Sequence, residues 1–215
     1  MTNAQMILNM KELQDSFNEK TVKGWRYEIS SEQWKTAIVT EASEAIESLD
    51  FKFWKKGKND WDNYLVEQID LWHFLMSLHI SVNNHYDLEY LWDITNEIDI
   101  NETKDADIHI EKCKELIANT LSYEVHDAIT TFFVIWRMIG LDIIDLYRGY
   151  LVKNTLNEFR RKNGYKDGTY IKMWNYQDSA EVEDNKIVFE IACDIKVEDL
   201  QNNLYKEIET FYKEM

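Results

Sequence analysis

The sequence predicts an all-α fold. The 215 residues include no proline and only 6 glycines, so the chain lacks the main helix breakers and has few of the turns that a many-stranded fold needs. Hydrophobic residues make up 45% of the chain and aromatic residues 13%, which is enough to fill a sizeable core. We expect a single domain over residues 1–215, with a rigid core of about 1–82 and 124–175 and a small mobile inserted helical region of about 83–122.

The first part of the chain carries three helix patterns. Residues 3–20 and 30–49 are amphipathic, and Ser30 or Ser31 can cap the first turn of the second helix. Residues 62–82 are apolar almost all round, which is typical of a helix that lies inside the fold. The third helix is therefore expected in the core.

The middle of the chain is polar and then apolar again. Residues 83–122 hold a long acidic run, which we interpret as a solvated face on a pair of short helices, without chemistry. Residues 124–139 predict a buried helix that ends at Gly140.

The last part predicts one long helix and a mixed tail. Residues 142–162 form the helix pattern, which the Asn163-Gly164 pair ends, and residues 165–174 continue as a loop. In the tail, the apolar segment 186–195 predicts either a short strand or a helix, and a terminal helix follows it.

The chain is strongly acidic, with a formal net charge of −16, which weighs against nucleic acid or an anionic membrane surface as a partner. The N-terminal segment lacks the basic start and apolar run of a signal peptide, and no stretch reaches the roughly 18 apolar residues of a membrane span. Cys113 and Cys193 match no zinc spacing and provide no disulfide framework. These features predict a soluble, cytoplasmic protein that binds neither nucleic acid nor membrane.

Four carboxylates occupy helix positions close to the expected core. Glu41 and Glu44 are spaced i, i+3 on the second predicted helix, and Glu67 and Asp70 have the same spacing on the third, so each pair shares a helix face. Glu67 falls in the apolar stripe of its helix, with Asp70 on the edge of that stripe.

Carboxylates that cluster away from water need a positive partner, because both desolvation and like-charge repulsion oppose them. The two helices offer only Lys35 ahead of the acids. Hard divalent cations favour all-oxygen sites, so the paired spacing indicates a Mg²⁺ site. The alternative is solvated surface charge, since a chain with 40 acidic residues produces ExxE spacings often by chance.

Two basic segments contrast with the acidic remainder. Residues 148–172 hold seven Lys or Arg residues and only two acids, and Lys153, Asn157 and Arg160 fall on one helix face. Residues 51–58 hold four more lysines among three aromatic rings. Cations bind phosphate oxygens and flat rings stack on a base, whereas the alternative is that these residues only balance the acidic surface and fill the core. Together with the acids, the basic segments favour a nucleoside polyphosphate as ligand.

Four sequence segments, in this order, resemble the all-α dimeric dUTPases of the MazG-like NTP pyrophosphatase superfamily. They are LQDSFN (13–18), EASEAIESLDFKFWK (41–55), EQIDLWHF (67–74) and KNTLNEFRRKNGYKDGTYIKMW (153–174). The resemblance implies a helical bundle of the all-α NTP pyrophosphatase type.

The resemblance also implies a role for each matching side chain. Two or three Mg²⁺ ions would be held by Glu41, Glu44, Glu67 and Asp70, with Glu41 also acting as the catalytic base. The uracil edge would be read by Gln14 and Asn18. The nucleoside and the phosphates would be bound by Lys52, Trp54, Lys55, Lys153, Asn157, Arg160, Tyr165 and Lys166.

The activity that the resemblance implies is Mg²⁺-dependent hydrolysis of dUTP and dUDP to dUMP, by attack of a metal-activated water on the phosphate chain, with release of pyrophosphate or phosphate. The protein would act as a homodimer. Two alternatives stay open: a pyrophosphatase for another nucleotide such as dCTP, and a catalytically silent helical binding module.

Overall fold

The structure, a computed structural model, describes residues 1–82, 87–175 and 181–214. Ten α-helices form within these ranges: α1 (Asn3–Thr21), α2 (Trp25–Glu28), α3 (Ser31–Glu47), α4 (Trp61–Ser81), α5 (Leu88–Asn96), α6 (Ala106–Leu121), α7 (Val125–Met138), α8 (Ile143–Lys162), α9 (Asp184–Cys193) and α10 (Leu200–Glu214). The same ranges contain two short strands and one 3-10 helix: β1 (Met173–Trp174), β2 (Val182–Glu183) and η1 (Val197–Asp199). The predicted all-α class is confirmed. None of the helices in the described ranges combines the length and apolar character that a bilayer crossing demands.

Polar side chains fix where the early helices begin. Thr2 and Gln5 form a capping box ahead of α1, and Ser30 and Gln33 form another ahead of α3. The Asp60 carboxylate accepts a hydrogen bond from the first turn of α4. These caps satisfy backbone N–H groups that a helix start leaves without a partner.

The helices predicted over residues 3–20, 30–49, 62–82, 124–139 and 142–162 agree with the structure to within about one turn, whereas the short α2 was not predicted. The segment 186–195, for which strand and helix were both open, lies largely in helix α9. Residues 173–174 differ from the predicted loop, because they pair antiparallel with β2, Met173 opposite Glu183 and Trp174 opposite Val182. The partner strand comes from the tail, so local sequence did not indicate the pairing.

The chain divides into two units, residues 1–147 and 148–215, with the division inside α8. The predicted rigid core with a mobile insert in a single domain stays a prediction.

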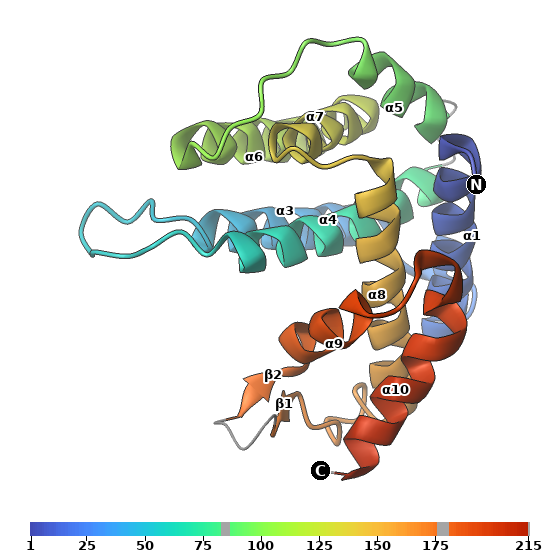
Figure 1. Cartoon of the computed structure of the whole chain (residues 1–215). Helices are drawn as coiled ribbons and strands as arrows, with labels where there is room; N and C mark the ends of the chain where they lie inside the picture. The colour runs from blue at the N-terminus through green and yellow to red at the C-terminus, as the bar shows by residue number, and fades with distance from the viewer. Residues whose placement is uncertain (83–86, 176–180, 215) are drawn as a thin grey trace. The chain divides into compact units, whose positions relative to one another are not determined.

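In the first unit, α3, α4, α7 and α6 form a four-helix bundle. α3 contacts α4 and α6, and α7 contacts the same two helices, so the contacts close a ring. α3 and α4 run antiparallel, and the loop that connects them projects beyond the bundle (Figure 1). α1 packs against α4, and α5 packs against α7.

Small and flat side chains bring the bundle helices together. Ala42 and Ala45 of α3 are fully buried. Trp72 of α4 stacks on Phe132 of α7, with ring centroids 5.1 Å apart. Small buried residues of this kind let a helix approach its neighbours closely.

The region predicted as a solvated insert contributes to this core. Cys113 and Leu116 of α6 are fully buried, and α6 packs against α3 and α7. The Tyr64 hydroxyl donates to His109 Nδ1 at 3.1 Å. The acidic residues therefore cover only the outer side of α6, and its inner side belongs to the bundle.

In the second unit, aromatic rings fill the space between α8, α10 and the β1–β2 pair. Phe159 meets Tyr212 with ring centroids 5.2 Å apart, and Trp174 stacks on Phe211 at 5.6 Å. The Trp174 indole N–H donates to the Ile171 carbonyl at 2.8 Å. The tail, for which the sequence offered no motif, thus supplies half of a compact aromatic core.

A buried histidine makes the stability of the protein depend on pH. His79 of α4 is 1% exposed. Burial is the main cause that lowers its pKa to about 4; the Lys11 charge adds to the effect and the Asp87 charge opposes it. In the unfolded chain the pKa returns to about 6.5. As pH falls from about 6.5 to about 4, the unfolded chain binds a proton that the folded chain does not, so the free energy of unfolding decreases, by up to about 3 kcal/mol.

We expect urea unfolding near pH 7 and near pH 5 to show a larger loss of stability on acidification for the wild type than for His79→Leu, which has no titrating group there. An equal loss in the two proteins would assign the pH dependence to other groups.

Candidate functional site

Three of the four predicted metal ligands meet between two neighbouring helices. Glu41 of α3 and Glu67 and Asp70 of α4 each offer a carboxylate oxygen, and these oxygens lie within 4.8 Å of one another. All three residues are half-buried. The i, i+3 spacing on α4 and the close approach of α3 produce this arrangement.

The fourth predicted ligand, Glu44, does not belong to this cluster. It is exposed one turn further along α3, and it lines a shallow surface hollow with Thr40 and Ser43. Its role as a ligand stays a prediction.

The acid cluster fits a Mg²⁺ ion. Carboxylate oxygens are hard ligands, and Mg²⁺ holds them at about 2.0–2.1 Å, so oxygens within 4.8 Å of one another reach one ion by small side-chain rotations. A similar group at the start of α7, Glu124, His126 and Asp127, lies mostly on the surface. Proximity is therefore not specific by itself; the half-buried place between two packed helices distinguishes the first cluster.

An asparagine that the sequence did not indicate supports the cluster. Asn63 Nδ2 donates to Glu67 Oε1 at 3.1 Å and to Ser48 Oγ at 2.7 Å. Ser48 follows the end of α3, so Asn63 connects the end of one helix with an acid of the other. The signal that could have found it is the i, i+4 spacing from Asn63 to Glu67.

The cation nearest in sequence to the acids is engaged elsewhere. Lys35 is 2% exposed, pairs with Glu32 at 3.0 Å and lies over the Tyr123 ring. The Tyr123 hydroxyl also donates to Glu32 at 2.6 Å. Lys35 therefore belongs to a contact between α3 and the α6–α7 turn.

The two amides predicted to read the base lie in a buried network between α1 and α4. Gln14 Nε2 donates to Asn18 Oδ1 at 3.1 Å and to Ser77 Oγ at 3.0 Å. Asn18 Nδ2 donates to the same hydroxyl at 2.9 Å, and His73 Nδ1 donates to Gln14 Oε1 at 2.6 Å. All four side chains are at most 5% exposed. The network holds both amides in one orientation.

His73 and Ser77 were missed because they come from a distant helix, 59 and 63 residues from Gln14. Their signal was the i, i+4 spacing, which puts the two polar residues on one face of α4.

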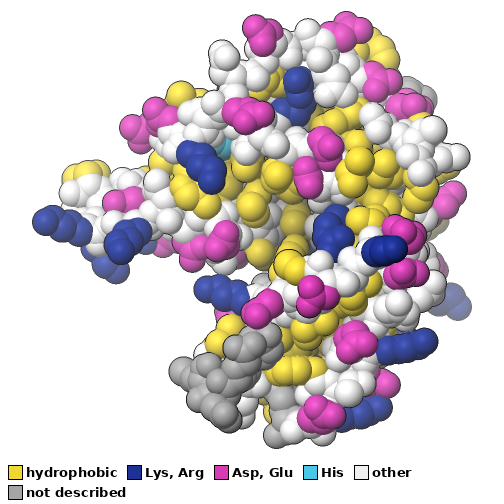
Figure 2. Space-filling view, viewed as in Figure 1, with side chains coloured by type: hydrophobic (Ala, Val, Ile, Leu, Met, Phe, Trp, Pro, Cys, Tyr) yellow, Lys and Arg dark blue, Asp and Glu magenta, His cyan; other side chains and the backbone are white. Residues whose placement is uncertain are grey.

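The loop between α3 and α4 carries the other candidate ligands of the first unit. Trp54 is 64% exposed and Phe53 94% exposed, and their rings meet edge to face at 4.9 Å. Lys52 forms an ion pair with Glu47, whereas Lys55 is exposed. Figure 2 shows basic side chains, in dark blue, gathered at the tip of this loop, whose basic residues are all lysines. A hollow of about 730 Å³ between the loop and α6 is lined by all three candidates, Lys52, Trp54 and Lys55.

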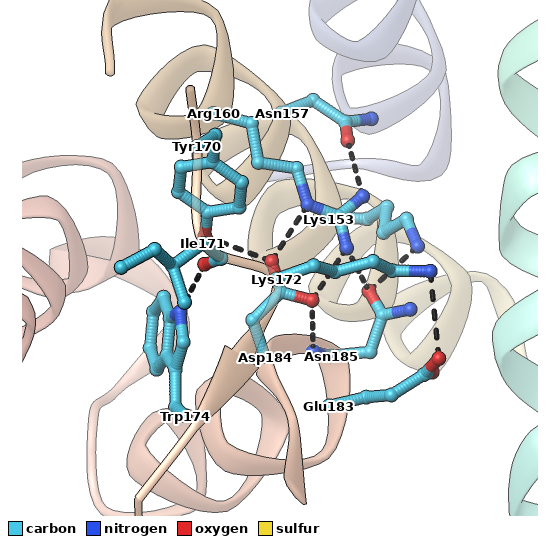
Figure 3. Close-up of polar contacts among 10 residues, drawn as sticks. All are labelled: Lys153, Asn157, Arg160, Tyr170, Ile171, Lys172, Trp174, Glu183, Asp184 and Asn185. Atoms are coloured by element: carbon cyan, nitrogen blue, oxygen red, sulfur yellow. Dashed lines mark hydrogen bonds and ion pairs between the residues drawn. The ribbon is translucent and has the colours of Figure 1, made fainter. Parts of the chain in front are cut away.

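In the second unit, the predicted polar face of α8 contacts the first residues of α9. Arg160 Nε and Nη2 donate to the two oxygens of Asp184, at 2.8 and 2.6 Å (Figure 3). Lys153 Nζ donates to Asn185 Oδ1 at 2.8 Å, and Arg160 Nη2 reaches the same oxygen at 3.2 Å. Asn157 Oδ1 lies 3.5 Å from Arg160 Nη1. The structure thus brings Lys153, Asn157 and Arg160 together.

The remaining candidates lie in the loop after α8. The Tyr165 ring is 53% exposed, and the Arg160 guanidinium lies over it, 5.6 Å from the ring centroid. Lys166 is exposed. Sequence reasoning missed Asp184 and Asn185, since both lie in an acid-rich tail where a single acid carries no signal.

Comparison with known proteins agrees with the geometry. A family model described as dUTPase matches residues 6–165. The match includes every predicted site residue except Lys166, and it ends before Asp184 and Asn185. No curated protein matches the chain.

The Asn63 contacts predict an effect on metal affinity. Asn63→Ala removes the donor that holds Glu67, and loss of such a supporting hydrogen bond typically lowers metal affinity by about 10- to 100-fold. Calorimetric titration with Mg²⁺ measures the change. Asn119→Ala is the matched control, because Asn119 donates to Thr131 away from the acids. Equal Mg²⁺ affinity of Asn63→Ala and the wild type would show that Glu67 is oriented without this contact.

Proposed function

The chain belongs to the dUTPase family and is a dUTP diphosphatase, and from this premise we propose that it also hydrolyses dUDP and that both reactions require Mg²⁺. The observation that carries the metal requirement is the meeting of Glu41, Glu67 and Asp70 between α3 and α4. Oxygen ligands in this number and spacing bind Mg²⁺ more favourably than they bind a softer metal ion.

Glu41, Glu67 and Asp70, with Glu44 as a further candidate, would hold two or three Mg²⁺ ions. When bound, Mg²⁺ supplies Lewis-acid polarisation of phosphate oxygens and of the attacking water. Glu41 would orient this water and accept its proton as general base. Asn63 would keep the Glu67 carboxylate in place. The water attacks the phosphate chain, and dUMP leaves with pyrophosphate from dUTP or with phosphate from dUDP.

Gln14 and Asn18 would read the base. An amide presents a donor and an acceptor, and its orientation decides whether it pairs with uracil or with cytosine. The hydrogen bonds from His73 and to Ser77 support a fixed orientation of the Gln14 amide, and hence discrimination between the two pyrimidines. Trp54 would pack against the nucleoside, and its exposed ring leaves a flat face accessible.

The cations would bind the phosphate chain. In the first unit these are Lys52 and Lys55, which line the hollow beside α6. In the second unit they are Lys153 and Arg160, with Tyr165 and Lys166 in the following loop and Asn157 beside Arg160. An arginine fork and lysine ammonium groups suit phosphate oxygens, which supports this assignment.

We further propose a homodimer in the cytoplasm. Phe53 and Trp54 expose apolar surface on the projecting loop, which supports an interface. Both cysteines are free thiols, which fits a reducing compartment. Light scattering in solution tests the dimer, and fractionation of cells tests the location.

The proposed function is tested by an assay that compares dUTP, dUDP, dCTP, dTTP and UTP with and without Mg²⁺. We expect dUMP from dUTP and dUDP only, and loss of turnover when EDTA removes the metal. A preference for dCTP would contradict the base assignment, and turnover that persists in EDTA would contradict the metal requirement.

Glu41→Gln tests the base. The amide keeps the size of the side chain but cannot accept the proton of the water, so we expect kcat to fall by about 10²-fold or more, while the affinity for a non-hydrolysable dUTP analogue changes much less. Steady-state kinetics and calorimetry measure the two quantities. Glu12→Gln, at an exposed acid of α1, is the control. Wild-type turnover in Glu41→Gln would contradict the assignment.

A further inference from the structure

The contact between Arg160 and Asp184 joins the part of the chain that matches the family with the part that does not. Arg160 lies before residue 165, where the family match ends, and Asp184 lies after it. Both side chains are buried, at 9% and 0% exposure. The guanidinium and the carboxylate form two parallel hydrogen bonds, the strongest geometry for this pair.

Four donors hold the Asp184 carboxylate. Its Oδ2 accepts from Arg160 Nε and from the Tyr170 hydroxyl, both at 2.8 Å. Its Oδ1 accepts from Arg160 Nη2 at 2.6 Å and from the backbone N–H of Asn185 at 2.8 Å. Burial and the neighbouring Asp184 charge raise the pKa of Tyr170, so its hydroxyl stays protonated and donates. Displacing this carboxylate would leave several buried donors without an acceptor, which is costly.

The pairing uses one particular edge of the guanidinium. Arginine has two edges that can bind an acid with two hydrogen bonds, one made of Nε and Nη2 and the other of Nη1 and Nη2. Asp184 takes the first edge. The second edge faces the neutral amide oxygens of Asn157 and Asn185, at the longer distances of 3.5 and 3.2 Å. A charged phosphate oxygen competes with a neutral amide more readily than with a buried carboxylate.

We propose that Asp184 is a positioning residue, which holds Arg160 by its Nε–Nη2 edge so that the Nη1–Nη2 edge meets the phosphate chain of the nucleotide. The segment beyond the family match thereby completes the phosphate-binding group of the second unit. Lys153 joins it through Asn185, whose side-chain oxygen accepts from both cations. This inference depends on the proposed role of Arg160 in phosphate binding.

A competing possibility is that Asp184 occupies the place of a phosphate and blocks Arg160 until the nucleotide displaces it. The number of donors on Asp184 weighs against this possibility, because a displaceable group would be held by few contacts.

The test measures binding of a non-hydrolysable dUTP analogue and of deoxyuridine by calorimetry with Mg²⁺ present. The proteins are the wild type, Asp184→Asn, Arg160→Ala and the double variant. Glu158→Gln is the matched control, because Glu158 also pairs with an arginine of α8, Arg161, which has no proposed role in phosphate binding.

We expect Asp184→Asn to weaken analogue binding by about tenfold and to leave deoxyuridine binding unchanged. In turnover, KM for dUTP should rise more than kcat falls. Because Asp184 acts through Arg160, the double variant should bind the analogue no more weakly than Arg160→Ala alone. Glu158→Gln should resemble the wild type.

Other outcomes overturn the proposal. If Asp184→Asn binds the analogue with wild-type affinity, the guanidinium needs no positioning by Asp184. If it binds the analogue more tightly, Asp184 competes with phosphate. Additive losses in the double variant, or an equal loss of deoxyuridine binding, show that Asp184 does not act through Arg160. Failure of the wild type to bind the analogue would contradict the proposed phosphate site itself. Normal binding by both the wild type and Asp184→Asn would contradict only the positioning role of Asp184.

Tyr170→Phe keeps the test decisive if Asp184→Asn does not fold. It removes one donor to Asp184 and retains the ring that stacks on Tyr212. We expect a loss of analogue affinity of about threefold, again without effect on deoxyuridine. An unchanged affinity in Tyr170→Phe would then overturn the proposal.

Discussion

The close approach of α3 and α4 is the constraint on which the rest of the first unit depends. The packing of these two helices brings Glu41 within reach of Glu67 and Asp70, with carboxylate oxygens within 4.8 Å of one another. Carboxylates at this separation repel one another, and their half-buried place weakens the screening by water. The packing of the bundle core therefore holds the three carboxylates together against their repulsion. In an isolated pair of helices, this repulsion would push the helices apart.

Local periodicity was sufficient for the long helices and for residues that share one helix face. It did not indicate the short α2, and it left strand and helix both open for α9. It predicted that Glu67 and Asp70 share a face of α4 and that Lys153, Asn157 and Arg160 share a face of α8, because spacings of three, four and seven residues are decided within one element. Periodicity did not indicate that Glu44 is exposed. A step of three residues turns the helix by about 300°, so Glu44 points about 60° away from Glu41, and only the position of the neighbouring helix decides which of the two faces it.

What the sequence did not indicate are the partners that come from distant segments. His73 and Ser77 meet Gln14 across 59 and 63 residues, and Asp184 meets Arg160 across 24 residues. The local sequence around a polar residue of a core helix, or around an acid of an acidic tail, does not indicate which distant residue it will contact. In both cases the sequence indicated the candidate residue but not the residue that holds it. The residues that support a candidate site are thus less predictable from sequence than the candidate residues, since the supporting contacts are tertiary contacts.

The aromatic core of the second unit has a spectroscopic consequence. Trp174 is the one tryptophan of residues 148–215, and the other seven belong to the first unit. Its indole is fully buried and stacked on Phe211. Subtracting the emission of a Trp174→Phe protein from that of the wild type isolates an intrinsic fluorophore for the second unit alone, so that loss of structure there can be followed separately from melting of the four-helix bundle.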